Sequence, residues 1–181
     1  MRIAVASDHA GFDLKAAVAR HLAQAGHQVT DLGTGSADVP VDYPTFGRAV
    51  GRAVAEGRAE RGVAVCGTGI GIGMAANKVP GVRAAVVHDV TTASLARRHN
   101  DANVICLGGR TLGWAEALDA VDAFFAATFA GGHHQPRLDE LAALDGLRPA
   151  VAPGAGPAAG PEPAPPPSRV GGAQTKAGAE P

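Results

Sequence analysis

The residues best suited to chemistry lie between Val63 and Lys78, in the stretch VAVCGTGIGIGMAANK. An apolar run ends there in Cys66, and glycine then occupies every second position as far as Gly73. Glycine allows successive backbone N–H groups to converge on an anion, and the start of a helix adds a partial positive charge. A thiol in such surroundings is favoured as its thiolate, which can act as a base or a nucleophile. A buried cysteine at a strand end, followed by a tight turn, explains the pattern equally well.

The glycine loop does not match the common nucleotide-binding patterns. The dinucleotide fingerprint G-x-G-x-x-G must directly follow a strand. Counted from Gly67, the sixth position is Ile72, and the alternative GIGMAA from Gly71 starts too late, inside the expected helix. The G-K-[ST] sequence of a phosphate-binding P-loop is absent from the chain. The loop is therefore better interpreted as a cradle for an anion or a developing oxyanion.

The elements that must position this loop alternate between strand-like and helix-like patterns. Strands separated by helices favour an α/β fold with a parallel sheet covered on both faces. The continuous apolar runs VAVC and AAVV are typical of strands buried on both sides. We expect strands at residues 2–7, 27–33, 62–67, 81–89 and 102–109, and helices at 12–24, 44–60, 70–77, a segment through His99 capped by Thr91 or Thr92, 113–129 and 136–147.

In a parallel sheet the functional site lies beyond the carboxyl ends of the strands. Four predicted strand ends carry polar or glycine-rich sequence. They are Asp8 and His9, the segment 66–73, His88 and Asp89, and Gly109 and Arg110. Cys106 falls inside the fifth strand pattern and is expected in the core.

Composition excludes several classes of function. The chain has 181 residues and a formal net charge of −1, so no strong field favours nucleic acid or an anionic membrane. No apolar run is long enough to cross a bilayer, and the one at the N-terminus is too short for a signal peptide. Two cysteines make a disulfide framework unexpected, which favours a reducing cytoplasmic setting. No pair of histidines has metal-ligand spacing with a third ligand, so no metal is expected.

The composition changes near Arg148 and divides the chain. Residues 149–181 contain nine of the thirteen prolines and no aromatic residue. Such a segment cannot bury enough apolar surface to offset its ordering entropy. We therefore expect one folded domain at 1–148 and a disordered tail rich in proline, alanine and glycine at 149–181.

Four motifs in collinear order resemble the type B ribose-5-phosphate isomerases, a family that includes galactose-6-phosphate and allose-6-phosphate isomerases. The motifs are SDHAGFDLK, CGTGIGIGMAANK, ARRHNDANVICLGGR and GGHHQPR, and the resemblance covers about residues 1–147. It implies a Rossmann-like three-layer α/β/α sandwich with a five-stranded parallel sheet. It also implies a homodimer or tetramer with active sites in the cleft between subunits, and cofactor-free isomerisation of a sugar phosphate through an enediolate.

The resemblance assigns the catalytic roles. Cys66 matches the family's base; some members have serine there and use a glutamate four residues later, where this chain has Ile70. Thr68 would stabilise the enediolate together with the backbone N–H groups of Gly67, Gly69 and Gly71. His99 matches the residue that opens the sugar ring, although a histidine at a helix C-terminus also suits the helix dipole.

The resemblance also assigns substrate contacts. Asp8 would hold sugar hydroxyls, His9 would reach the phosphate or assist ring opening, and Tyr43 would line the pocket. A helix cap is an equally good interpretation of Asp8, and loop packing of Tyr43. Asn100 would bind a substrate hydroxyl, with helix capping as its alternative.

Arg110 and Arg137 match phosphate-binding positions, and the arginine fork suits phosphate oxygens. At this site the sequence departs from the family pattern, because GGHHQPR stands where other members read GGRHQ.R. His133 thus replaces a phosphate-binding arginine. We give His134 and Pro136 no role, and interpret His21, His27, His88 and Asp89 as surface or structural residues.

These residues predict an isomerase that interconverts ribose 5-phosphate and ribulose 5-phosphate, a reaction of the pentose phosphate pathway. The departure at His133 motivates a second hypothesis, in which the substrate is a tetrose, allose or galactose phosphate or a free rare sugar. A third hypothesis is a non-catalytic sugar-phosphate-binding subunit. The joint presence of Cys66, Thr68 and His99 argues against the third. The preferred sugar and the choice of dimer or tetramer stay open.

Overall fold

A computed structural model describes residues 1–145 and shows one parallel sheet at its centre. The strands are β1 (Arg2–Ser7), β2 (Gln28–Asp31), β3 (Arg61–Cys66), β4 (Ala84–Val86) and β5 (Val104–Gly108). Their order in the sheet is β2-β1-β3-β5-β4, and every neighbouring pair is parallel. The prediction of an α/β fold with a five-stranded parallel sheet is confirmed.

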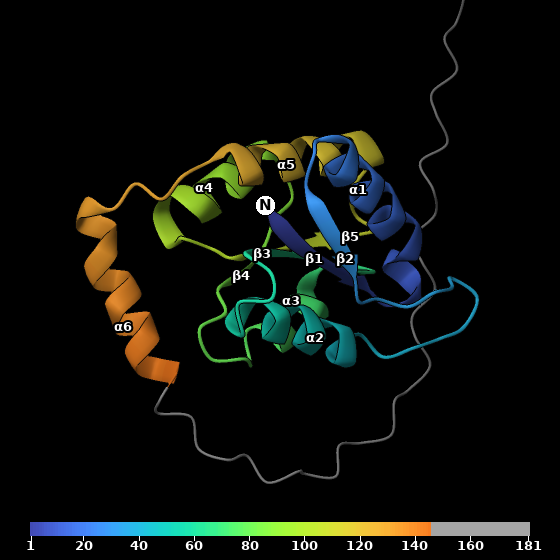
Figure 1. Ribbon diagram of the computed structural model, residues 1–181, viewed down its shortest axis with the longest axis horizontal. Helices are drawn as coiled ribbons and strands as arrows, with labels where there is room; N and C mark the ends of the chain where they lie inside the picture. The colour runs from blue at the N-terminus through green and yellow to red at the C-terminus, as the bar shows by residue number, and fades with distance from the viewer. Residues whose placement is uncertain (146–181) are drawn as a thin grey trace, which may run out of the picture. The chain divides into compact units, whose positions relative to one another are not determined.

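Helices cover both faces of this sheet and complete the three layers (Figure 1). Helices α1 (Phe12–Gln24), α4 (Val90–Asn100) and α5 (Trp114–Ala126) lie on one face, and α2 (Tyr43–Ala55) and α3 (Ile70–Ala76) lie on the other. Short 3₁₀ turns at His9–Gly11 and Gly132–His134 precede α1 and α6 (Gln135–Asp145). The order of elements matches the predicted alternation.

The alternation of side chains along each strand divides the core into two apolar clusters. Val63 and Val65 of β3 pack with Phe124 under α1, α4 and α5, and all three are fully buried. Ala64 and Cys66 of the same strand face α2 and α3. Fully burying an aliphatic side chain stabilises the fold by about 1.5–3 kcal/mol, so the central strands hold the sheet, and the site at its edge, rigidly.

The start of α4 differs from the prediction. The helix is capped by Asp89, whose side chain accepts a hydrogen bond from Thr92 N–H at 2.6 Å, and Thr92 Oγ1 in turn accepts from Asp89 N–H at 3.3 Å. The predicted cap at Thr91 or Thr92 is therefore wrong. A carboxylate is the better cap, because it takes the N–H of the third helical residue while Thr92 completes the capping box. The bond from Thr92 lowers the pKa of Asp89.

Most predicted elements are longer than the observed ones, and three differ by the most or have a clear local cause. Helix α2 ends at Ala55 instead of residue 60, because Gly57 adopts a left-handed conformation with φ of 71°. Helix α5 ends at Ala126 instead of residue 129, because Ala127 is extended. Strand β4 has three residues instead of nine, since it lies at the edge of the sheet and pairs with β5 alone.

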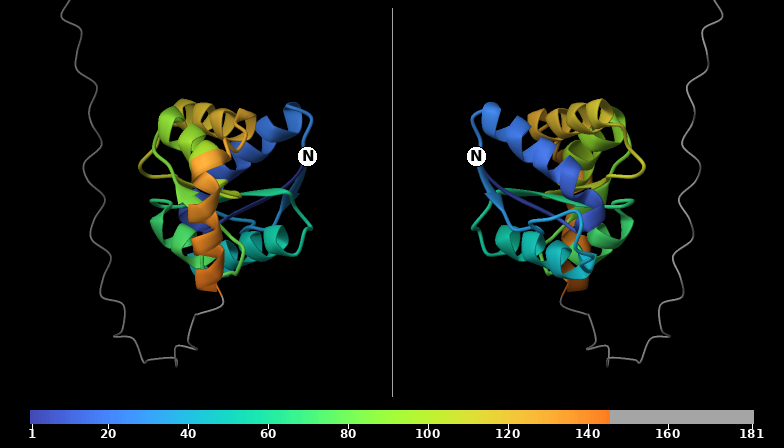
Figure 2. Two further views of the ribbon diagram at one scale, coloured as in Figure 1. Left: turned by 90° about the vertical axis from the view of Figure 1, so that its left-hand side faces the viewer. Right: turned by 90° about the vertical axis from the view of Figure 1, so that its right-hand side faces the viewer.

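Helix α6 lies beside the β4 edge of the sheet and crosses both helix layers (Figure 2). Leu138 is its one buried residue. The predicted end of this helix at residue 147 and the predicted tail at 149–181 fall outside the described residues. Within residues 1–145, none of the helices is both long and apolar enough to span a membrane.

Candidate functional site

The carboxyl ends of β1, β3 and β5 bring a first group of predicted site residues together. Backbone hydrogen bonds join the three loops: Asp8 N–H donates to Val65 O at 3.3 Å, Gly109 N–H to Cys66 O at 2.8 Å, and Arg110 N–H to Gly67 O at 2.9 Å. We call this group the carboxyl-edge cluster. Its members are Asp8, His9, Tyr43, Cys66, Gly67, Thr68, Gly69, Gly71 and Arg110.

The Cys66 thiol lies under the glycine loop. Its side chain is 4% exposed, and its Sγ accepts a hydrogen bond from Gly69 N–H at 3.2 Å. This contact requires Gly69, because its φ is 78° and an added Cβ would lie 2.9 Å from the carbonyl carbon of Leu107. The loop backbone therefore fixes the position of the Cys66 sulfur at the end of β3.

The outer side of the loop is more open. Thr68 is exposed, and its Oγ1 accepts a hydrogen bond from Ile70 N–H at 3.3 Å. The ring of Tyr43, at the start of α2, packs against Gly71, since a Cβ on Gly71 would lie 2.7 Å from the Tyr43 Cζ. The tyrosine is 42% exposed, so it forms a wall of the cluster and is not part of the core.

Asp8 combines a capping role with an electrostatic one. Its Oδ1 accepts a hydrogen bond from Gly11 N–H at 3.0 Å and caps the turn before α1. Burial raises the pKa of Asp8, and the Gly11 N–H, the charge of His9 and the charge of Arg110 partly oppose that rise. The carboxylate is therefore poorly hydrated, and a substrate hydroxyl can supply the hydrogen bond that water would otherwise provide.

Two basic side chains flank Asp8. The Nδ1 of His9 accepts a hydrogen bond from Val41 N–H at 3.2 Å, which fixes the ring against the loop before α2. The side chain of Arg110 passes over Gly67, because a Cβ there would lie 3.4 Å from the Arg110 Cδ. The cluster thus carries a base candidate, a hydroxyl acceptor and two groups that attract anions.

Cys106 is in the core, as predicted. It is fully buried on β5, and both cysteines are unpaired. In the sheet register Cys66 pairs with Gly108 while Cys106 pairs with Ala64, so the two sulfurs are offset along the strands. Burial, with a smaller contribution from the charge of Cys66, raises the pKa of the Cys106 thiol. This thiol stays protonated and is unsuited to catalysis.

A second group of predicted site residues gathers where α4 ends and α6 begins. The rings of His99 and His134 are stacked, with centroids 4.3 Å apart and planes at 16°. The ring of His133 lies 4.0 Å from that of His134 at 40°. We call these three residues the histidine stack. The charge of Arg137 also acts on His134.

The sequence offered no role for His134, and the structure places it at the centre of the stack. It is the most buried of the three histidines, with 8% of its side chain exposed. Burial lowers its pKa, and the positive charges of His133, His99 and Arg137 lower it further. The central ring is therefore neutral near pH 7.

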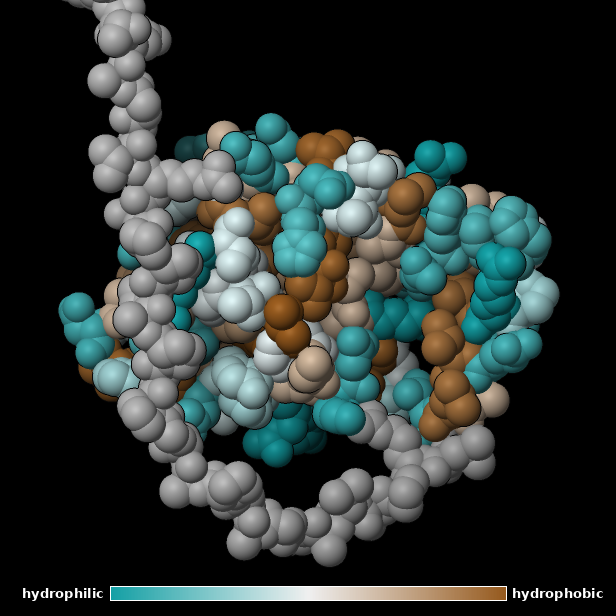
Figure 3. Space-filling view, turned by 180° about the vertical axis from the view of Figure 1, so that it is seen from behind, coloured by the Kyte–Doolittle hydropathy of each residue, from teal (hydrophilic) through white to brown (hydrophobic). Residues whose placement is uncertain are grey.

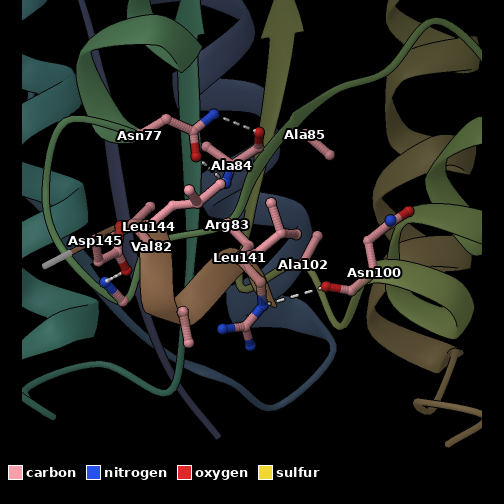
Figure 4. A pocket seen from close by; sticks show the side chains of 12 residues that line it. Asn77, Val82, Arg83, Ala84, Ala85, Asn100, Ala102, Leu141, Leu144 and Asp145 are labelled. Atoms are coloured by element: carbon pink, nitrogen blue, oxygen red, sulfur yellow. Dashed lines mark hydrogen bonds between the residues drawn. The ribbon is translucent and has the colours of Figure 1, made fainter. Parts of the chain in front are cut away.

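The end of α4 is also clamped from below. Arg83 Nε donates to the carbonyl oxygen of Asn100 at 3.2 Å (Figure 4). The same Nε donates to the carbonyl oxygen of Asp101 at 3.1 Å, and Nη2 donates to Asp101 Oδ2 at 2.8 Å. Asp101 has a φ of 44° and also pairs with Arg97 at 2.7 Å. The clamp compensates the cost of this left-handed turn and fixes His99 and Asn100.

Within one chain, the carboxyl-edge cluster and the histidine stack lie at opposite ends of the strands. Helix α4 starts after β4 at the carboxyl edge and runs back to the amino edge. There Gly62 N–H, at the start of β3, donates to Asn103 O at 2.9 Å. Cys66 ends the same strand, and four residues of strand span about 13 Å. Within a single chain, the carboxyl-edge cluster is therefore far from the histidine stack, Asn100 and Arg137.

A pocket of about 500 Å³ opens beside Asn100, between α6 and the β4 edge. Leu141 and Leu144 of α6 line it and are 46% and 56% exposed (Figure 4). Hydrophobic side chains gather on the inner side of α6 in Figure 3. Within residues 1–145 no three histidine, cysteine, aspartate or glutamate side chains are placed to hold a metal ion.

Comparison with known proteins gives a consistent result. The sequence model of the Ribose/Galactose Isomerase family matches residues 3–141. Ribose-5-phosphate isomerase B of Escherichia coli is 42% identical over 147 residues, which cover 81% of this chain and 98% of that enzyme. The enzyme of the same name from Mycolicibacterium paratuberculosis is 46% identical over 143 residues, covering 78% of this chain and 90% of that enzyme.

Solved structures agree. Ribose-5-phosphate isomerase B of Clostridium thermocellum superposes with a TM-score of 0.80 at 45% identity, covering 81% of this chain and 99% of that one. The Mycoplasma genitalium enzyme, solved with bound ribulose-5-phosphate, gives a TM-score of 0.78 at 42% identity and covers 81% of this chain and 97% of that one. The chain therefore belongs to the ribose/galactose isomerase family, and within it to the type B ribose-5-phosphate isomerases.

Proposed function

We propose that this chain interconverts ribose 5-phosphate and ribulose 5-phosphate through an enediolate, without a cofactor. Relatives named ribose-5-phosphate isomerase B match this chain over nearly their whole length. One of them was solved with bound ribulose-5-phosphate. The observation that supports the chemistry best is the Cys66 thiol, held by Gly69 N–H within the cluster that also contains Asp8 and Arg110.

Cys66 acts as the base in this proposal. Its thiolate removes the proton from C2 of the open-chain aldose and returns it to C1, while the proton of the C2 hydroxyl moves to the oxygen on C1. A positioned base typically contributes about 10²–10⁴-fold to the rate. Thr68 and the N–H groups of Gly67 and Gly71 stabilise the enediolate oxygens. The N–H of Gly69 instead donates to the sulfur of Cys66 and positions it.

The remaining roles draw on both groups of residues. His99 exchanges protons with the ring oxygen and the anomeric hydroxyl, and so opens the furanose. Asn100 and Asp8 bind sugar hydroxyls, and Tyr43 lines the pocket. The phosphate is held by four basic residues that come from both groups, namely His9, Arg110, His133 and Arg137.

A complete site therefore needs two copies of the chain. We propose a homodimer, alone or paired into a tetramer, in which the carboxyl-edge cluster of one subunit faces the histidine stack of its partner. Two observations support it: the separation of the groups by the length of β3, and the apolar pocket beside Asn100, which a second copy can cover. Two-fold symmetry then gives two identical sites. Two unpaired buried thiols fit the reducing cytoplasm that we propose as its location.

His133 supports a second candidate function of the same chemistry. The exposed imidazole replaces the family's arginine and packs on His134, so it offers fewer hydrogen bonds to a phosphate than a guanidinium does. A tetrose, allose or galactose phosphate, or a free rare sugar, is the corresponding alternative substrate.

The first test is isomerisation by the purified full chain in the presence of a chelator, with ribose 5-phosphate beside a panel of the other sugars. We expect the highest kcat/KM for ribose 5-phosphate, and a loss of about 10²–10⁴-fold in Cys66→Ala. Cys106→Ala is the matched control and should retain activity. Preference for another sugar would reject the first substrate in favour of the second. An active Cys66→Ala would remove the cysteine from the mechanism.

A further inference from the structure

His134 is the one member of the histidine stack to which the proposed function gives no role. Its ring lies between the rings of His99 and His133 and is 8% exposed. An aromatic ring that is buried and nearly parallel to another restricts how the other can tilt and rotate. His99, by contrast, is only half-buried, and no other ring contacts it among the described residues.

The backbone holds His134 firmly against α4. Gly131 and Gly132 both have positive φ, 64° and 57°, and turn the chain from α5 toward α6. His134 N–H closes this turn on Gly131 O at 3.1 Å, and Ala130 N–H donates to Arg98 O at 2.9 Å, one residue before His99. The turn and the end of α4 together thus fix the backbone position of His134, from which its ring packs against that of His99.

We propose that His134 is a positioning residue for sugar-ring opening. Its ring stacks on the ring of His99 and fixes the orientation of the His99 imidazole, which exchanges protons with the substrate. This inference rests on the proposed role of His99. His134 touches no reacting atom in it. Because the His134 ring acts in this proposal only through its flat face, the phenyl ring of His134→Phe should serve equally well.

The test separates ring opening from the later proton transfer. The natural aldose is a furanose, whereas 4-deoxyribose 5-phosphate lacks the hydroxyl that closes the ring and is already an open-chain aldehyde. A stacking contact of this kind corresponds to about a two- to tenfold effect on rate. We expect His134→Ala to lower kcat for ribose 5-phosphate by that factor and to leave kcat for the 4-deoxy substrate unchanged.

Three further variants complete the design. His134→Phe should retain most of the activity on both substrates, and His99→Ala should lose activity on the furanose selectively. His27→Phe is the matched control, since His27 is a half-buried histidine with a ring contact to Phe125 and no place in the site. It should behave like the parent.

A second readout does not depend on turnover. In the NMR spectrum of the histidine-labelled protein, the ring current of His134 shifts the Cε1–H signal of His99. That signal should move in His134→Ala and stay near its parent position in His134→Phe. An unmoved signal in His134→Ala would overturn the proposal.

The kinetic outcomes separate the two proposals. Equal losses on both substrates in His134→Ala would reduce His134 to a structural or phosphate-binding residue and reject the inference. A phenyl variant as impaired as the alanine variant would show that the imidazole nitrogens are needed, which also rejects it. If His99→Ala shows no selective loss, the ring-opening role of His99 fails and the inference fails with it, even where the NMR signal confirms the stack.

Discussion

The carboxyl-edge cluster and the histidine stack are built by different means. In the cluster, backbone hydrogen bonds among the loops after β1, β3 and β5 fix Asp8, Cys66 and Arg110. In the stack, side-chain contacts fix His99: the ring of His134 on one side and the clamp of Arg83 and Asp101 beneath the end of α4. The sheet thus organises one half of the proposed site, and side-chain packing organises the other.

This difference suggests a division of labour in the proposed reaction. The rigid half holds the base and the enediolate, where small displacements cost the most rate. The other half opens the ring and holds part of the phosphate. In the proposed dimer the two halves meet across two copies of the chain, so each can be inactivated separately.

The largest expected effect comes from mixing two inactive variants. Cys66→Ala destroys the first half and His99→Ala the second. When differently tagged chains are co-expressed, half of the dimers carry both variants, and each of these has one intact site. Activity should therefore rise to about a quarter of the parent value. The mixture is compared with each variant purified alone.

Failure of the mixture would be decisive once mixed dimers have been isolated by their two tags. A complete site within one chain predicts no recovery at all, because each chain then carries its own defect. The control pair is Cys66→Ala with Cys106→Ala, in which the active Cys106→Ala chain alone sets the level.

The next effect tests the buried carboxylate of the cluster. Asp8→Asn keeps an oxygen for Gly11 N–H but removes the charge, and hydrogen bonds to charged groups are the stronger ones, so kcat/KM should fall by about 10–100-fold. Stability should change in the opposite direction. Burial raises the pKa of Asp8, so the folded parent loses stability as the pH rises from the usual carboxyl range through that raised pKa.

The thermal midpoint of Asp8→Asn at pH 7 should therefore exceed that of the parent, and the gap should close at acid pH. Calorimetry across this range checks the sign. A less stable variant at pH 7 would mean that contacts to the charged form outweigh its burial.

The wall of the cluster can be tested with a smaller change. Gly71→Ala would place a methyl group 2.7 Å from the Tyr43 Cζ, so the exposed ring must move outward. We expect KM to rise by about two- to fivefold with little change in kcat, because in the proposed site the ring lines the substrate pocket and touches no reacting atom. Gly35→Ala is the control, since a Cβ there meets nothing within 4 Å.

A double variant sharpens this prediction. If Gly71→Ala acts only by displacing the ring, it should add nothing to the effect of Tyr43→Ala. Additive losses would instead show that the methyl group disturbs the glycine loop itself.

The same difference between the two halves explains what the sequence could predict. Apolar runs and glycine-rich turns identify β1, β3 and β5, and the rule for parallel sheets then places Asp8, Cys66 and Arg110 at one edge. The length of α4 also implies that His99 reaches the opposite edge, although the motifs alone do not show it. His134 was missed because its contact with His99 spans 35 positions and leaves no periodic pattern. The remaining wrong predictions, such as the cap of α4 and the length of β4, depend on local contacts that the sequence pattern does not show.

The smallest expected effect is a pH dependence of stability that arises from the histidine stack. Burial and the charges of His133, His99 and Arg137 lower the pKa of His134, so the folded chain binds fewer protons than the unfolded chain just below pH 6.5. Stability should then be fully present above that pH and decline as the pH falls through the lowered pKa. His134→Phe keeps a ring in the stack but cannot be protonated. Its denaturant midpoint should therefore change less between pH 7 and pH 5 than the midpoint of the parent does. A steeper decline in His134→Phe would mean that the protonated ring is stabilised in the fold, and that His134 carries charge beside His99.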